Sequence, residues 1–264
     1  MELELSRNPP DWPHFLTAVV LVMIRLSGIM VFAPVFSSEA IPARVKIVFI
    51  LAVSALLAPL VSALPSAHAE IGVVPVIGEL GVGLVLGLSL SMVSEMLLFA
   101  GQVFGFQFSF SLVNLLDPNS PVQTPLMGQL LLLLGTLVVI ASGLHRTILF
   151  AILRSFSNAP VGAVFCDGGV GLSMAKLMSG VLFAALQLAA PVLAATLLAE
   201  VTIAVMSRIS PQLPVMIVAV PAKTLLGYIV LIGSLALWPR FIEMRFSYLL
   251  DCAEQLIRRT AEAR

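Results

Sequence analysis

The chain has 264 residues, of which 59% are hydrophobic and only 11% are charged, against about 25% charged residues in a typical soluble domain. This composition excludes an ordinary water-soluble protein and indicates a membrane protein with several spans, or a subunit of a membrane complex in contact with lipid. The 14 basic residues balance 14 acidic ones, which argues against nucleic-acid binding, because that function requires a basic face. The two cysteines have neither the spacing of metal ligands nor a context that favours a disulfide.

The first half of the chain contains three long apolar segments, at residues 15–36, 47–67 and 71–100. Each is long enough to span a bilayer as a helix. Gly83 and Gly87 in the third segment form a small-xxx-small pair, which predicts the close approach of another helix. The start of the chain is acidic and broken by prolines, so it lacks the positive region of a cleavable signal. We therefore expect the first apolar segment to remain in the mature protein.

The second half contains four further apolar segments and a charged tail. The apolar segments occupy residues 126–144, 147–165, 177–206 and 215–238. The tail, residues 239–264, has apolar residues at a spacing of three to four, which predicts an amphipathic helix. The five arginines of the tail place it in the cytoplasm by the positive-inside rule.

Hydropathy thus predicts six or seven helical segments, two of them longer than a bilayer requires. The predicted fold class is all-α, with long broken helices and hairpins, because spanning strands must close into a barrel and the sequence lacks the alternating barrel pattern. The sequence contains no nucleophile elbow, phosphate-binding loop or zinc-protease motif. The three histidines lie in separate loops. We therefore expect no metal site, no cofactor and no enzymatic activity.

Residues 101–125, GQVFGFQFSFSLVNLLDPNSPVQTP, differ from the apolar segments on either side. Phenylalanines occupy every second position from Phe104 to Phe110. An extended segment would place them on one face, whereas a helix would distribute them around its circumference. Apolar side chains on one face would suit a constriction that closes a passage by excluding water. A bend packed between two helices is the alternative, and the residues alone leave both open.

Two sets of residues in this stretch carry the predicted roles. Glycine relaxes the backbone and proline ends a helix, so the stretch can leave one helix before the next begins at Leu126. The candidate hinges are Gly101, Gly105, Asp117 and Pro118. The candidate constriction consists of seven apolar residues: Phe104, Phe106, Phe108, Phe110, Leu112, Leu115 and Leu116.

Six ionisable residues lie inside the apolar segments, where each would cost about 2.5–3.5 kcal/mol at a helix centre. Such residues usually face a protein interior or water. They can pair with one another or with neighbouring subunits. An ion or proton relay is a second interpretation, and residues near segment ends can extend to the membrane surface. The six residues are Arg25, Glu79, Glu95, Arg154, Glu200 and Lys223.

Several short strings follow one another in order along nearly the whole chain. They are SSEAIPARVK at 37–46, the stretch 101–125, GLHRTI at 143–148, Ser155-Phe156 before Pro160, Ala190-Pro191, and RISPQLP at 208–214. With this series the chain resembles the FliR family, flagellar export-gate subunits whose counterparts serve virulence type III secretion. The most specific strings are the stretch 101–125 and the corner that contains Arg208 and Gln212.

The resemblance implies a single domain whose first part, about residues 1–185, is FliP-like and whose remainder, about residues 186–264, is FliQ-like. Family members assemble with FliP-like and FliQ-like subunits, and with FlhB-like and FlhA-like ones, into a closed channel in the bacterial inner membrane at the flagellar basal body. The channel conducts unfolded flagellar proteins, and the loop that matches residues 104–122 plugs it. The resemblance also implies subunit contacts for the six intramembrane charges and for the corner, although Pro214 and Met216 depart from the family pattern.

Other functions remain open on the residues alone. An ion-coupled secondary transporter would use Glu79, Glu95 and Glu200. Such carriers usually show repeated halves with paired broken helices, and the sequence contains no internal repeat. An intramembrane enzyme would need catalytic residues that the sequence lacks. Within the family, the sequence separates flagellar from virulence use only weakly.

Overall fold

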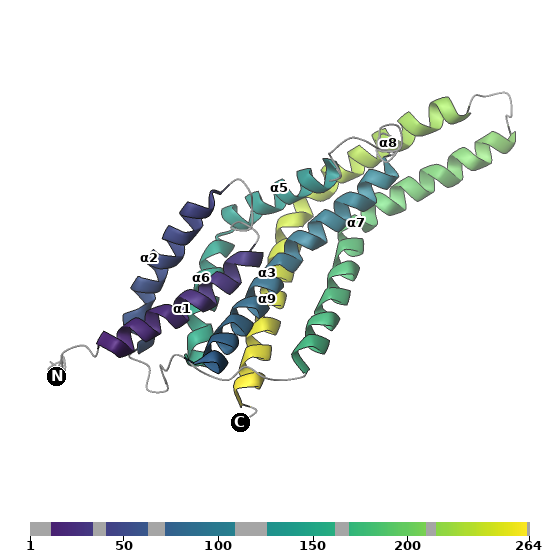
Figure 1. Cartoon of the computed structure of the whole chain (residues 1–264). Helices are drawn as coiled ribbons and strands as arrows, with labels where there is room; N and C mark the ends of the chain where they lie inside the picture. Colours follow the sequence, from purple (N-terminus) through teal and green to yellow (C-terminus); the bar gives the residue numbers. More distant parts are fainter. Residues whose placement is uncertain are drawn as a thin grey trace, which may run out of the picture. The chain divides into compact units, whose positions relative to one another are not determined.

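The computed structural model describes residues 12–33, 41–62, 72–108, 126–161, 169–209 and 215–262 (Figure 1). These residues form helices, with no strand among them, so the predicted all-α fold is confirmed. In chain order the elements are α1 (Trp12–Phe32), α2 (Ala43–Ser62), α3 (Val73–Gln107), α5 (Leu126–Ala141), α6 (Leu144–Asn158), α7 (Gly169–Ile209), α8 (Val215–Ser234), the 3-10 helix η1 (Leu235–Leu237) and α9 (Trp238–Glu262).

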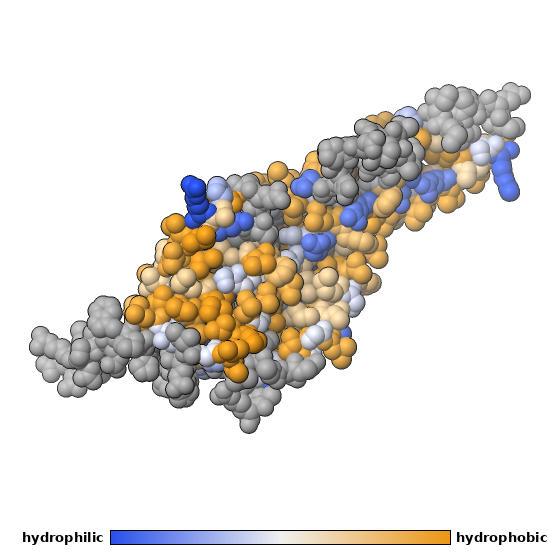
Figure 2. All heavy atoms as spheres, in the orientation of Figure 1, coloured by the Kyte–Doolittle hydropathy of each residue, from blue (hydrophilic) through white to orange (hydrophobic). Residues whose placement is uncertain are grey.

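Five helical stretches among the described residues are long and apolar enough to cross a membrane, or up to six if the bent pair α5 and α6 counts as one span. Among the described residues in view in Figure 2, hydrophobic ones predominate. The two helices predicted to exceed the bilayer thickness are present, because α3 has 35 residues and α7 has 41. The helix predicted in the charged tail corresponds to α9.

The bend between α5 and α6 lies where a glycine permits it. The two helices are bent by 73° at a short break. Gly143 has a φ of +72°, a left-handed conformation that costs glycine little and most other residues more. The Gly143 amide donates to the carbonyl oxygen of Ile140 at 3.2 Å, which closes the last turn of α5.

The chain forms two compact units that alternate along the sequence. Unit 1 comprises Met1–Ser91, Arg146–Met174 and Leu249–Arg264, and unit 2 comprises Met92–His145 and Ala175–Tyr248. The long helices α3, α7 and α9 each contribute residues to both units. The predicted division into a FliP-like and a FliQ-like part near residue 185 stays a prediction.

In unit 1, α1 and α3 meet through glycines. A Cβ atom at Gly83 would overlap the carbonyl oxygen of Arg25, and one at Gly87 would lie 2.9 Å from the carbonyl oxygen of Ile29. Any larger residue would therefore push the helices apart. The close approach predicted for the Gly83–Gly87 pair is confirmed, and small residues at membrane-helix contacts permit it.

In unit 2, α5 packs in the same way against the second half of α3. A Cβ atom at Gly101 would overlap the backbone of Gly128, and one at Gly135 would overlap the side chain of Leu97. Gly101 and Gly105 both lie inside α3. Because a side chain at position 101 would overlap α5, Gly101 has a packing reason to be glycine. A hinge role for these two glycines stays a prediction.

Candidate functional site

The second half of α3, in unit 2, has a buried face and an exposed face. Residues four and three apart share a helix face, and the buried face carries Leu97, Gly101, Phe104 and Phe108 in that spacing. The backbone is helical as far as Gln107, and the Phe108 amide still donates to the Phe104 carbonyl oxygen at 2.9 Å. Of the two conformations considered for the phenylalanines, the helical one therefore applies up to residue 107, and the extended one is wrong there.

An aromatic stack fixes the end of α3 within unit 2. The Phe104 ring centroid lies 6.1 Å from that of Phe108 and 6.4 Å from that of Trp238 in α9. The Phe108 centroid lies 4.7 Å from that of Tyr228 in α8. Such stacked pairs contribute about 0.5–1.5 kcal/mol each beyond their burial. We call these four residues the aromatic anchor.

Gly227 makes room for the aromatic anchor. A Cβ atom at this position would overlap the ring of Phe108. Phe104 and Phe108 are 0% and 3% exposed, so neither ring is free to obstruct a passage from its position here. Sequence reasoning gave no role to Gly227, Tyr228 or Trp238, because no local pattern links α8 and α9 to the central stretch.

The exposed face of the same half-helix carries Glu95, Gln102 and Phe106, and Phe106 is 71% exposed. Of the described constriction candidates, only Phe106 therefore presents its ring away from the core of the unit. The remaining candidates lie outside the described residues: Phe110, Leu112, Leu115 and Leu116, together with the hinge candidates Asp117 and Pro118.

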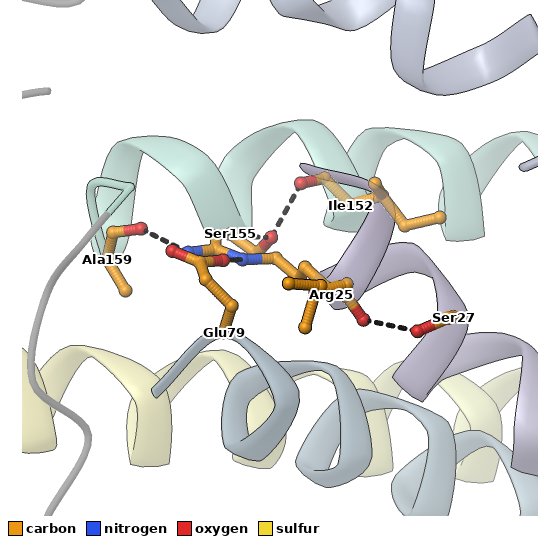
Figure 3. Close-up of polar contacts among 7 residues, drawn as sticks. Arg25, Ser27, Glu79, Ile152, Ser155 and Ala159 are labelled. Carbon is orange, nitrogen blue, oxygen red and sulfur yellow. Dashed lines mark hydrogen bonds and ion pairs between the residues drawn. The ribbon is translucent and has the colours of Figure 1, made fainter. Parts of the chain in front are cut away.

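Unit 1 holds a buried cation at the contact of three helices (Figure 3). Arg25 of α1 donates from Nε to Glu79 Oε2 of α3 at 2.6 Å. It also donates from Nη1 to Ser155 Oγ at 3.3 Å and from Nη2 to the Ala159 carbonyl oxygen at 2.9 Å, at the end of α6. The guanidinium lies 4.2 Å from the centroid of the Phe156 ring. The side chains of Arg25 and Glu79 are each 1% exposed.

The contacts of this cluster stabilise the Arg25 cation, which would be costly to place in lipid. Three guanidinium nitrogens have acceptors, and a carboxylate and an aromatic face lie beside the cation. A buried ion pair of this kind is costly to break, at about 3–5 kcal/mol when one partner is removed. Of the interpretations considered for intramembrane charges, mutual pairing applies to Arg25 and Glu79.

The other intramembrane charges differ in their surroundings. In unit 2, Lys223 of α8 pairs with Glu200 of α7. In unit 1, Arg154 Nη1 lies 3.9 Å from Glu254 Oε2, but the Arg154 side chain is 69% exposed. Glu95 has no ion pair with any residue that the structure describes.

The remaining polar candidates lie in or beside the end of α7. Arg208 is exposed there, and Gln212 lies outside the described residues. Contacts of any of these residues with neighbouring subunits stay a prediction. Within the described part of the chain, no group of three histidine, cysteine, aspartate or glutamate residues could hold a metal ion.

Comparison with the sequences of known proteins relates the chain to a family. Residues 16–249 match the family model described as "Bacterial export proteins, family 1". The flagellar biosynthetic protein FliR of Bacillus subtilis strain 168 is 29% identical over 244 residues, which cover 91% of this chain and 94% of that protein. FliR of Escherichia coli K12 is 21% identical over 257 residues, 96% and 97% of the two chains. The Yop proteins translocation protein T of Yersinia pestis is 32% identical over 162 residues, 58% and 61%. Because the family match spans most of the sequence, the chain belongs to the bacterial export proteins of family 1, the FliR family.

Proposed function

We propose that the chain is a non-enzymatic subunit of the flagellar type III protein export gate in the bacterial inner membrane. With FliP-like and FliQ-like subunits, and next to FlhB-like and FlhA-like ones, it forms the channel through which unfolded flagellar proteins leave the cytoplasm. The observation that carries this proposal is the match to FliR proteins over nearly the full length of both chains. The helices long and apolar enough to span a membrane support it.

The central stretch supplies the plug of this channel in the proposal. Phe106 is exposed on α3 just before residues 109–125, and an apolar ring at a narrow passage excludes water and therefore ions. Phe110, Leu112, Leu115 and Leu116 complete the obstruction. Phe104 and Phe108 take a different part, because their rings are buried in the aromatic anchor. They hold the base from which the plug begins.

Flagellar use is favoured over the virulence counterpart. The FliR proteins of Bacillus subtilis and Escherichia coli align over 91% and 96% of this chain, whereas the Yersinia translocation protein aligns over 58%. The wider coverage includes segments near both ends of the chain.

Deletion of the gene in its native host tests the proposal. We expect flagellar substrates to disappear from the culture medium and motility to be lost, while cytoplasmic levels of the same substrates persist. Re-expression of the wild-type chain should restore both. Normal secretion of flagellar proteins in the deletion strain would contradict the proposal, and loss of virulence effectors alone would assign the chain to the other system.

A further inference from the structure

We propose that the exposed face of the second half of α3 lines the export path and contacts the unfolded, hydrated polypeptide that passes through it. This face, the polar stripe, consists of Glu95, Gln102 and Phe106. The proposal rests on the proposed function, since it names where that channel meets its substrate.

Helix geometry places the three residues in one line. They are seven and four positions apart, so at about 100° per residue their directions lie within about 40° of one another. At about 1.5 Å per residue, the stripe from Glu95 to Phe106 is roughly 16 Å long. No other residue of unit 2 in α3 is as exposed. Phe99, four positions after Glu95 and three before Gln102, lies half-buried on the same face. Two of the three exposed residues are polar.

The carboxylate of Glu95 disfavours lipid as the neighbour of the polar stripe. Glu95 lies within the candidate span Val73–Gln107, and a carboxylate on a lipid-facing surface would cost about 2.5–3.5 kcal/mol at the centre of a span. Buried Glu79 has Arg25 as its partner, whereas Glu95 is exposed and forms no ion pair within the described part of the chain. Water, or a chain that travels in water, satisfies such a group.

The opposite face of α3 fixes the direction of the stripe within unit 2. Gly101 lies against Gly128 of α5, and Phe104 and Phe108 stack on Trp238 and Tyr228. Rotation of this half-helix would break both contacts. The stripe therefore keeps one orientation relative to α5, α8 and α9.

The composition of the stripe favours a moving polypeptide over a docked helix. Contacts between membrane helices are rich in small residues that allow close approach, and the stripe contains none: Gly101 faces α5, and Gly105 is also buried. The stripe carries two long polar side chains, which can exchange hydrogen bonds with the peptide groups of an unfolded chain. It ends at an exposed aromatic ring, where an apolar constriction can limit the leak of water and ions.

Cysteine accessibility in the assembled gate tests this inference. Single cysteines replace Glu95, Gln102 or Phe106 in a chain whose native Cys166 and Cys252 are changed to alanine. A membrane-impermeant, charged thiosulfonate reagent should modify all three, and a stalled export substrate should protect them. Two controls should stay unmodified: Leu97→Cys on the buried face of α3, and Leu133→Cys on the exposed apolar face of α5.

A photo-crosslinking residue at position 102 identifies the neighbour directly. We expect crosslinks to the stalled substrate. Crosslinks to another gate subunit instead, or thiol modification at Leu133→Cys but not at Gln102→Cys, would overturn the inference. Co-purification of the gate subunits is measured on the same samples. An intact gate with an unreactive stripe contradicts this inference alone, whereas absence of any gate contradicts the proposed function.

Ion permeation provides a second, independent readout. Phe106→Ala should open a leak, and Glu95→Lys in that background should lower the ratio of cation to anion flux. Glu95→Gln should lower the ratio less, because it removes the negative charge without adding a positive one. An unchanged ratio in both double variants would remove Glu95 from the path.

Discussion

Arg25 shows how this chain accommodates a cation within an apolar helix. Its guanidinium is paired with Glu79, donates to Ser155 and Ala159, and lies over the Phe156 ring. The cluster joins α1, α3 and α6 within unit 1. Its directional hydrogen bonds would specify which helices meet, a selection that apolar packing alone makes poorly.

Removal of one partner of the buried pair should destabilise the protein strongly. For Arg25→Ala we expect a loss of about 3–5 kcal/mol, because the buried Glu79 carboxylate loses the cation that pairs with it. The double variant Arg25→Met/Glu79→Leu should recover most of that loss, since no buried charge remains. Thermal unfolding of the purified gate complex measures both. Arg154→Ala is the matched control and should cost less than about 1 kcal/mol, because Arg154 is exposed.

The same residues distinguish a structural pair from a proton relay. Glu79→Gln should reduce the amount of assembled gate before it changes transport. Normal assembly combined with export that no longer depends on the proton motive force would contradict the structural interpretation and support the relay.

Substitution of Gly227 by alanine tests the aromatic anchor, because it adds a single Cβ atom beside the Phe108 ring. Gly227→Ala should force the Phe108 ring out of its position and cost about 1–3 kcal/mol, as overpacking of a filled core does. Gly233→Ala lies on the same helix, and a Cβ atom there would meet nothing within 4 Å. This control should be neutral or slightly stabilising, because alanine favours helix over glycine by about 1 kcal/mol. Equal effects of the two substitutions on the melting temperature would argue against the anchor.

At the scale of elements, the second half of α3 combines two tasks on opposite faces. One face packs on α5, α8 and α9 through Gly101, Phe104 and Phe108. The other exposes Glu95, Gln102 and Phe106. A helix with one fixed face can present the other in a constant direction, which suits the base of a plug.

Substitutions on the two faces should therefore have different effects. Phe106→Ala should leave assembly at the wild-type level and make the resting channel leak small ions. Phe104→Ala should cost about 3–5 kcal/mol of stability through the cavity it leaves, and it should lower the yield of assembled gate. Conductance of reconstituted complexes and the recovered amount of complex are the two measurements. A Phe106→Ala channel as tight as the wild type would contradict the plug.

At the scale of the whole molecule, hydropathy alone predicted the class of fold and most of the helices. The apolar segments, the two overlong helices and the helix in the tail follow from composition and period, which are local properties. The extension of α3 through Gly101 to Gln107 was not predicted, because glycines and alternating phenylalanines are poor helix signals. Contacts with α5, α8 and α9 override that weak local preference.

The sequence also did not predict which residues contact one another within the site. Arg25 and Glu79 lie 54 positions apart, and hydropathy indicates that a buried charge needs a partner without indicating which one. Tyr228 and Trp238 stack on the phenylalanines from helices that follow much later in the chain. Such pairings depend on tertiary structure. The cytoplasmic position of the tail depends on the membrane and stays a prediction.

The proposed function requires that this chain works as one subunit among several. Affinity purification of the tagged chain from membranes of its native host, followed by mass spectrometry, tests this most directly. We predict that FliP-like and FliQ-like subunits co-purify in fixed ratios, and that the chain expressed alone aggregates because its exposed apolar faces lack their partners. A stable, monodisperse monomer that recovers neither subunit would contradict the role of the chain as a gate subunit.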